Sequence, residues 1–192
     1  IIGMTTFYVS SGSGDNTNTG LSGSGAKKTI AAALAIGTVA DGDTIEIIDE
    51  ETYPENNLLV NKANLTITHT ASNLGKPKIN GGGAASSRCF RLDSSGTTFQ
   101  GLEMYNAVNA FYKATTNGNY FHVTGCFIHD IQRLTSHLII GNESNKTSIN
   151  ESVLYFNNQP FSNAPILISH SVTLRNSLIT CSALSDNGVV YD

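Results

Sequence analysis

The stretch Phe99-Gln100-Gly101-Leu102-Glu103-Met104 decides the fold, because a phrase of the same kind returns three more times along the chain. Each phrase sets apolar residues on both sides of one small or polar residue. The later copies are Val123-Thr124-Gly125-Cys126-Phe127-Ile128, Ile149-Asn150-Glu151-Ser152-Val153-Leu154 and Leu174-Arg175-Asn176-Ser177-Leu178-Ile179. The small or polar position, Gly101 in the first copy, recurs after steps of 24, 26 and 25 residues. A fixed period of this length predicts a solenoid whose repeats stack on one another.

A second apolar phrase stands between these copies and supports the same period. Its copies are Phe90-Arg91-Leu92, Phe111-Tyr112-Lys113, Leu138-Ile139-Ile140, Ile166-Leu167-Ile168 and Val189-Val190-Tyr191. No helical period runs inside the repeat, so we expect two short strands per coil and a parallel β-helix. Inward residues should then stack in ladders, one of them made by Met104, Ile128, Leu154 and Ile179. The segments between the strands are expected to be loops: 105–109, 129–136, 155–164 and 180–187.

One short helix is expected before the coils, over residues 28–36. Ile30, Ala33 and Leu34 fall at i, i+3 and i+4 and give it one apolar face. A lone helix ahead of a stack of strands is expected to cover the apolar end of the solenoid, as terminal repeats must. The chain then divides, within a single domain, into two parts: 1–56, the N-terminal cap, helix and first coil, and 57–192, the β-helix coils.

The N-terminal residues carry a resemblance to a known family. In order along the chain they read Tyr8-Val9-Ser10, Gly14-Asp15-Asn16, Lys28-Thr29-Ile30, Gly42-Asp43-Thr44-Ile45 and Thr52-Tyr53-Pro54-Glu55. This order resembles the start of pectate-lyase-like right-handed β-helix proteins, by motif over 7–55 and by repeat only over 57–192. The resemblance implies an all-β, right-handed parallel β-helix of about 25-residue coils with a short N-terminal capping helix. It also implies a groove along one sheet that binds polysaccharide.

Composition argues against some partners and indicates a location. The formal net charge is −4 and the 11 Lys and Arg residues are scattered, whereas nucleic-acid binding needs a basic stripe, so no nucleic-acid partner is expected. No apolar run of about 18 residues occurs, so no membrane span is expected. Charged residues make up only 14%, which leaves Ser, Thr and Asn to solvate the surface. That composition is typical of secreted β-rich proteins, and we expect an extracellular protein or one on a particle surface.

The cysteines favour no disulfide framework. Cys89, Cys126 and Cys181 are an odd number, so at least one thiol stays unpaired. Cys126 lies within a repeat strand, where a small buried thiol is expected.

The best local candidate for catalysis is His129 beside Asp130, with Arg133 three residues on. A histidine next to a carboxylate can serve as a general base. A solvated turn is the alternative, because adjacent residues on a strand point apart. The acidic residues of the coils fall at different registers and include no Asp–Asp pair, so a clustered pair of catalytic carboxylates is not expected.

A strip for sugar binding is the second candidate site. Tyr105, His129 and Tyr155 share one ladder position, and sugar rings pack against such aromatic faces if the ladder points outward. Ordinary loop packing is the alternative. The next ladder position is expected to hold Asn106, Asp130, Phe156 and Cys181. Arg91 and Lys113 come near each other in register and are expected to add a small basic rung, with a solvated face as the alternative.

The end of the chain suggests assembly. Residues 188–192 read as the first strand of a further coil, and an unfinished coil exposes an apolar stack and a strand edge. We expect either a fragment of a longer protein or the docking of other copies on this open coil. A tolerated edge strand is the third interpretation.

Two function classes remain. The first is a non-catalytic extracellular module, of a surface, filament or phage-tail type, that binds polysaccharide or cell-surface glycan or stacks with copies of itself. The second, implied by the family resemblance, is a polysaccharide lyase or another carbohydrate-active enzyme. The missing ladders of carboxylates and basic residues favour the first. No cofactor is predicted, and Ca²⁺ would enter only in the case of a lyase.

Overall fold

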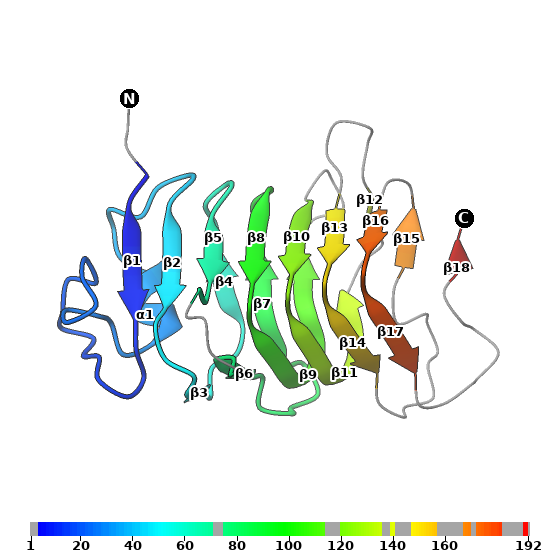
Figure 1. Cartoon of the computed structure of the whole chain (residues 1–192), viewed down its shortest axis with the longest axis horizontal. Coiled ribbons are helices and arrows are strands. Elements are labelled where there is room, and N and C mark those ends of the chain that lie inside the picture. The colour runs from blue at the N-terminus through cyan, green and yellow to red at the C-terminus, as the bar shows by residue number, and fades with distance from the viewer. Residues whose placement is uncertain are drawn as a thin grey trace.

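The chain folds into a parallel β-solenoid, which Figure 1 shows as a row of stacked strands. The computed structural model describes residues 4–70, 75–113, 120–135, 139–140, 147–156, 167–169, 172–181 and 190–191. Within these residues every strand pair is parallel. The predicted all-β solenoid with coils of about 25 residues and one short helix is confirmed.

Three sheets run along the solenoid. Sheet A has seven strands: β1 (Thr6–Val9), β2 (Thr44–Ile47), β5 (Thr66–Thr68), β8 (Thr97–Gln100), β10 (Phe121–Thr124), β13 (Thr147–Asn150) and β16 (Val172–Arg175). Sheet B has eight: β3 (Thr52–Tyr53), β6 (Lys78–Asn80), β9 (Glu103–Lys113), β11 (Phe127–Thr135), β14 (Val153–Phe156), β17 (Leu178–Cys181), β4 (Leu58–Val60) and β7 (Arg88–Leu92). Sheet C has three: β12 (Ile139–Ile140), β15 (Leu167–Ser169) and β18 (Val190–Tyr191).

The interior is one apolar core that extends from Phe7 to Leu154. The predicted ladder is confirmed by the register, in which Ile128 pairs with both Met104 and Leu154, and Leu154 also pairs with Ile179. Four phenylalanines fill the middle coils with successive ring centroids 4.6–4.7 Å apart: Phe90, Phe99, Phe111 and Phe121. Burying a side chain of this size stabilises the fold by about 1.5–3 kcal/mol, so these ladders hold the coils together.

The small or polar residue of each repeat has a structural reason. It sits in the turn between a sheet A strand and the next sheet B strand, and its backbone is left-handed. The φ values are +70°, +61°, +49° and +48° at Gly101, Gly125, Glu151 and Asn176. Glycine adopts this conformation without steric cost, and short polar residues adopt it more readily than branched ones. The sequence period is therefore the period of this turn.

Two details of the predicted coil are wrong. The coil crosses three strand rows, because β4, β7 and the second half of β9 make a further row that pairs Phe90 with Phe111. Residues 105–109 and 129–135 are strand, since β9 and β11 continue through them. Left-handed residues, Asn106 in β9 and Asp130 in β11, let each strand change direction there while the pairing continues.

The helix α1 (Ile30–Leu34) is shorter than the predicted span of 28–36. Thr29 is the N-cap of this helix, since its hydroxyl accepts a hydrogen bond from the Ala32 amide at 3.1 Å. The Glu55 carboxylate accepts from the amides of Ile30 and Ala31 at 2.9 and 2.8 Å. Glu55, the last residue of the N-terminal motifs, thus anchors the start of the helix to the first coil.

A loop covers the outer edge of β1. Tyr8 donates its amide to Gly20 and accepts from Lys27, and Ser10 donates to Lys27, with N–O distances of 2.7, 2.9 and 2.8 Å. Figure 1 shows this blue loop on the far side of β1 from β2. The first strand of sheet A is therefore paired on both sides.

Candidate functional site

The strip, defined as Tyr105, His129 and Tyr155, lies on the outward side of sheet B. These residues pair in register on β9, β11 and β14. They alternate with fully buried neighbours, so they point away from the core. The rings of Tyr105 and His129 are stacked, with centroids 5.3 Å apart and planes at 6°. The ladder predicted from the repeat is therefore present as a stacked surface.

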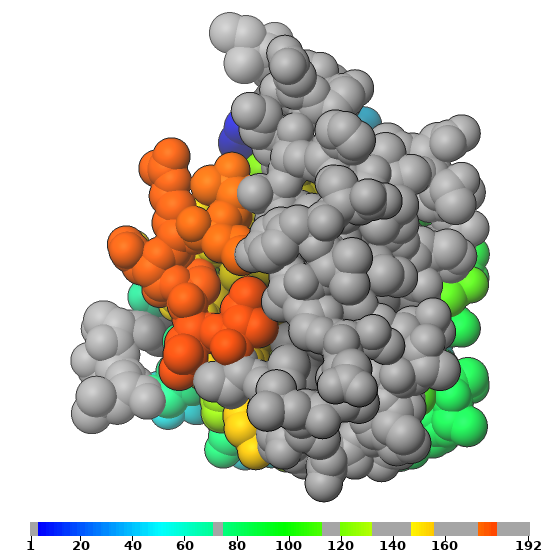
Figure 2. All heavy atoms as spheres, turned by 90° about the vertical axis from the view of Figure 1, so that its right-hand side faces the viewer, coloured from blue at the N-terminus to red at the C-terminus, as the bar shows by residue number. Residues whose placement is uncertain are grey.

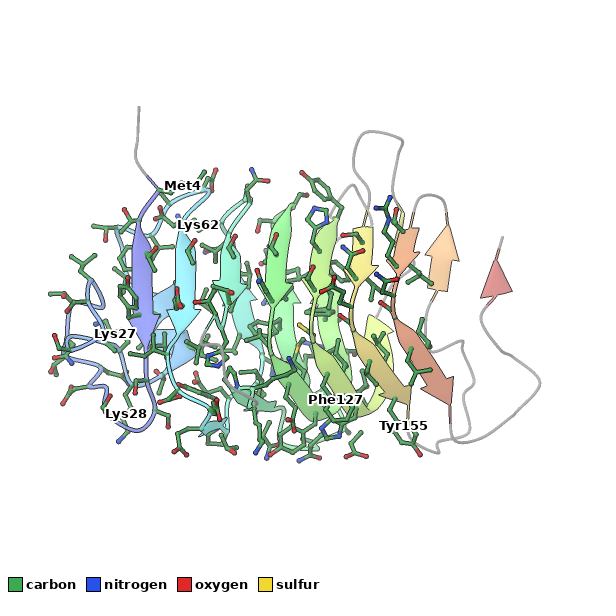
Figure 3. The ribbon with its side chains drawn as sticks, in the orientation of Figure 1. Met4, Lys27, Lys28, Lys62, Phe127 and Tyr155 are labelled. Carbon is green, nitrogen blue, oxygen red and sulfur yellow. The ribbon has the colours of Figure 1, made fainter. Side chains whose placement is uncertain are left out.

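Phe127 extends this surface along β11. Its ring lies 4.3 Å from that of His129 at 23°. Figure 3 shows Phe127 and Tyr155 on the same lower edge of the solenoid, and Tyr155 is 38% exposed. The outward surface therefore presents aromatic groups from neighbouring coils, which are about 4.8 Å apart.

His129 is held between two carboxylates. Its Nδ1 lies 2.9 Å from Asp130 Oδ2 and its Nε2 lies 3.1 Å from Glu103 Oε1. The side chains of His129 and Glu103 are 18% and 19% exposed, and that of Asp130 is 47% exposed. Both ring nitrogens are therefore engaged with carboxylate oxygens, and neither is left open to a substrate.

The contact with Asp130 depends on the bulge in β11. Adjacent residues of a regular strand point to opposite sides, but the register shifts between His129 and Ile131 and Asp130 has φ +49°. The bulge turns the Asp130 carboxylate back toward the imidazole. As a result Phe156 pairs with Ile131, so the predicted ladder that joined Asp130 to Phe156 is wrong.

A cavity of about 350 Å³ adjoins the strip. It is lined by side chains of both charges and by one aromatic ring: Glu50, Gly75, Lys76, Lys78, Glu103 and Phe127. Glu103 and Phe127 both also contact His129. Lys76 Nζ donates to the Gly125 carbonyl at 2.7 Å, which fixes one wall of the cavity to the turn before β11. The strip therefore has a polar recess with donors and acceptors beside it.

Among the predicted basic residues, Arg91 bonds elsewhere than on the strip. Arg91 pairs with Tyr112 in register, and its guanidinium bonds the Asp93 carboxylate at 3.0 Å. Lys113 pairs with Leu92, so Arg91 and Lys113 do not form the predicted rung. Arg133 pairs with the buried Asn109, beyond the bulge. The side chains of Lys113 and Arg133 lie outside the described residues.

We searched the part of the chain that the structure describes for metal-binding clusters and for reactive thiols. No group of three or more His, Cys, Asp or Glu side chains is placed to hold a metal ion there. Cys89 and Cys126 are unpaired and buried. Burial raises the pKa of Cys89 to about 12 and that of Cys126 to about 11, so neither thiol is a nucleophile near pH 7. The side chain of Cys181 lies outside the described residues.

None of the helices among the described residues has the length and apolar character that crossing a membrane requires.

The outward face of sheet A holds a second polar group that the sequence analysis missed. His122 on β10 pairs in register with Ser148 on β13, and His122 Nδ1 lies 2.8 Å from Ser148 Oγ. A cavity of about 520 Å³ opens beside them, lined by Thr124, Ser148, Asn150, Glu151, Thr173, Arg175 and Asn176. Figure 2 shows the orange atoms of β16 and its turn on the left of that view. The sequence signal that could have revealed this pair is that His122 and Ser148 occupy the same position in successive repeats.

Comparison with known proteins supports the fold. The structure resembles the GH136 lacto-N-biosidase from Eubacterium ramulus. In its selenomethionine form the TM-score is 0.56 at 16% identity, over 91% of this chain and 40% of the enzyme. The native form gives a TM-score of 0.48 at 17% identity, over 92% of this chain and 33% of the enzyme. No protein-family model and no curated protein matches the chain.

That similarity covers most of this chain but only part of the enzyme. The chain spans less than half the length of the lacto-N-biosidase that it resembles. At this identity the similarity concerns the β-solenoid fold alone, within which the strip and the sheet A cavity lie. The N-terminal resemblance to pectate-lyase-like proteins and this structural similarity agree on a parallel β-helix.

Proposed function

We propose that the chain is an extracellular β-solenoid module whose strip binds a glycan without catalysing a reaction on it. The single observation that carries the proposal is the stacked pair of Tyr105 and His129, continued in register by the exposed Tyr155. Sugar rings present C–H faces that pack on aromatic side chains, and their hydroxyls need donors and acceptors at the edge. The recess beside Glu103, with Lys76 and Lys78 on its walls, supplies those groups.

The clamp on His129 favours binding over catalysis. Both ring nitrogens face carboxylate oxygens, so the imidazole is held in one orientation and forms a rigid aromatic surface between Tyr105 and Tyr155. A ring that is already held in place loses little conformational freedom when a ligand binds. The resemblance of the solenoid to part of a lacto-N-biosidase supports a glycan as the ligand.

The test is the affinity of the whole chain for a panel of soluble polysaccharides, measured by titration calorimetry. Replacing Tyr105 and Tyr155 together by Ala removes two stacking surfaces worth about 0.5–1.5 kcal/mol each. We therefore expect binding about 5-fold to 150-fold weaker. Tyr8→Ala on sheet A is the control and should bind as the wild type does. Equal affinity of the double variant and the wild type, at equal thermal stability, would exclude the strip.

An enzyme acting on carbohydrate is the second candidate. The observation in its favour is that two carboxylates, Glu50 and Glu103, line the same recess, and glycosidases use a carboxylate pair. The engagement of Glu103 with His129 counts against it. Release of reducing ends or of unsaturated sugars from the same polysaccharides, abolished by Glu50→Gln, would establish the enzyme instead.

A further inference from the structure

The outward face of sheet A presents a hydroxyl directly beside an imidazole. Ser148 Oγ and His122 Nδ1 are 2.8 Å apart, within the range at which a base takes a proton from a nucleophile. The two residues belong to adjacent strands at the same register, so the rigid sheet fixes their separation. In the same outward row, Thr66 and Thr98 occupy the equivalent position of earlier coils. A histidine therefore stands in this row where the other coils carry hydroxyls.

The surroundings of His122 suit a base. The ring is half-buried, and burial lowers its pKa below the usual value of 6.5, so it is neutral near pH 7. The ring of Tyr120 packs edge-on against it, with centroids 5.6 Å apart and an angle of 69°. None of the ion pairs found in the described residues involves His122, unlike His129. In the tautomer that carries its hydrogen on Nε2, the lone pair of Nδ1 faces the Ser148 hydroxyl and accepts its hydrogen.

Donors for a developing negative charge stand next to the hydroxyl. Asn150 follows Ser148 by two residues on β13 and points to the same side, with its Nδ2 3.5 Å from Ser148 Oγ. Arg175 pairs in register with Asn150 and lines the same cavity. The Asn150 amide next to Ser148 is a donor of the kind that stabilises the oxyanion of acyl transfer, and Arg175 adds a positive charge to the same cavity.

The cavity admits a substrate of moderate size. Its volume of about 520 Å³ falls in the range of small-molecule sites, about 300–1,000 Å³. Its lining is hydroxyl, amide and charged side chains from β10, β13, β16 and the turns after them. Such a lining suits a polyhydroxylated alcohol that carries a small acyl group.

We propose that Ser148 and His122 form the catalytic pair of an esterase that removes small acyl groups from sugar hydroxyls. Ser148 Oγ attacks the ester carbonyl while its proton passes to His122 Nδ1, and the imidazolium returns that proton to the departing sugar oxygen. Water then attacks the acyl-serine, gives its proton to His122, and the carboxylic acid leaves as Ser148 regains its hydrogen. One ester and one water yield one acid and one alcohol. The choice of a sugar as the alcohol rests on the proposed function; the pair itself does not.

The first test uses probes that require no sugar recognition. The whole chain is treated with a fluorophosphonate, the labelled residue is identified by mass spectrometry, and hydrolysis of p-nitrophenyl acetate is measured. We expect label on Ser148 and, in both Ser148→Ala and His122→Gln, a fall in hydrolysis of about a hundredfold or more. Thr66→Ala, in the same outward row without a neighbouring histidine, is the matched control and should keep the wild-type rate. Thermal melting confirms that each variant is folded.

The outcomes separate this site from the strip. Wild-type hydrolysis at the buffer rate, label on another residue, or full activity in Ser148→Ala would each overturn the catalytic pair and leave glycan binding by the strip untouched. Acetate release from O-acetylated polysaccharides should fall in parallel in the two variants. Hydrolysis of p-nitrophenyl acetate without acetate release from any such polysaccharide would overturn the substrate class.

Discussion

His122 and His129 stand seven residues apart in one coil, yet they face two different surfaces of the solenoid. His129, on sheet B, lies between the carboxylates of Glu103 and Asp130 and stacks on Tyr105. His122, on sheet A, lies against the hydroxyl of Ser148. The first ring is held between two carboxylates, and among the described residues the second is hydrogen-bonded only to a hydroxyl.

The difference shows that an outward position on a parallel β-solenoid does not by itself determine the chemical environment of a histidine. Both rings are outward and in register with polar or aromatic groups of the next coil. Carboxylates engage both nitrogens of His129, whereas burial lowers the pKa of His122, which contacts a hydroxyl. The two proposals accordingly place binding on sheet B and chemistry on sheet A.

The turn that separates these two faces gives the largest expected effect. A Cβ at Gly101 would lie 2.6 Å from the backbone oxygen of His69, whereas one at Gly125 would have no neighbour within 4 Å. Both glycines have positive φ, which costs an alanine about 1–2 kcal/mol. Since overpacking against backbone adds about 1–3 kcal/mol, we expect Gly101→Ala to lose about 3 kcal/mol of unfolding free energy and Gly125→Ala about 1 kcal/mol.

Urea unfolding of the two alanine variants measures this difference. Equal losses would show that the turn, and not the close approach of His69, limits both positions. Such a result would also mean that the turn at Gly101 packs less closely against the His69 backbone than the structure indicates.

The pH dependence of hydrolysis is a second test of the contrast between the two histidines. A base works when it is unprotonated, so the rate should be constant above its pKa and fall about tenfold per pH unit below it. Because burial lowers the pKa of His122, the midpoint should lie below 6.5. The rate of p-nitrophenyl acetate hydrolysis between pH 4 and 8 is the measurement, with Thr66→Ala as the control. A rate that rises on acidification would mean that His122 is not the base.

The carboxylate clamp gives the smallest expected effect. Glu103→Gln keeps the shape of the side chain but removes the charge opposite His129 Nε2, a contact between two mostly buried side chains. We expect a loss of about 1 kcal/mol in unfolding free energy. The control is Asp93→Asn, since the Arg91–Asp93 pair is more exposed and should contribute less than about 0.5 kcal/mol. Equal effects of the two substitutions in thermal unfolding would mean that His129 is not clamped.

The repeat in the sequence predicted the interior of this molecule better than its surface. Met104, Ile128 and Leu154 stack inward as expected, and Tyr105, His129 and Tyr155 stack outward beside them. Hydrophobic alternation carries that information, because a one-residue slip would send every buried side chain into water.

The misses have physical causes as well. A left-handed residue such as Asp130 adds a position without interrupting the strand, so counting residues placed it on the wrong ladder. The pair of His122 and Ser148 was visible only as two equivalent positions 26 residues apart. One histidine near one serine carries no spacing signal until the register brings them together.

The loop on the outer edge of β1 has a consequence for solubility. Thr6-Phe7-Tyr8-Val9 is uncharged, β-branched and aromatic, the composition that seeds intermolecular sheets when its edge is free. Charged gatekeepers usually prevent such templating, and this strand has none. The backbone of Gly20 and Lys27 occupies the edge instead, so the molecule closes this strand edge with its own main chain.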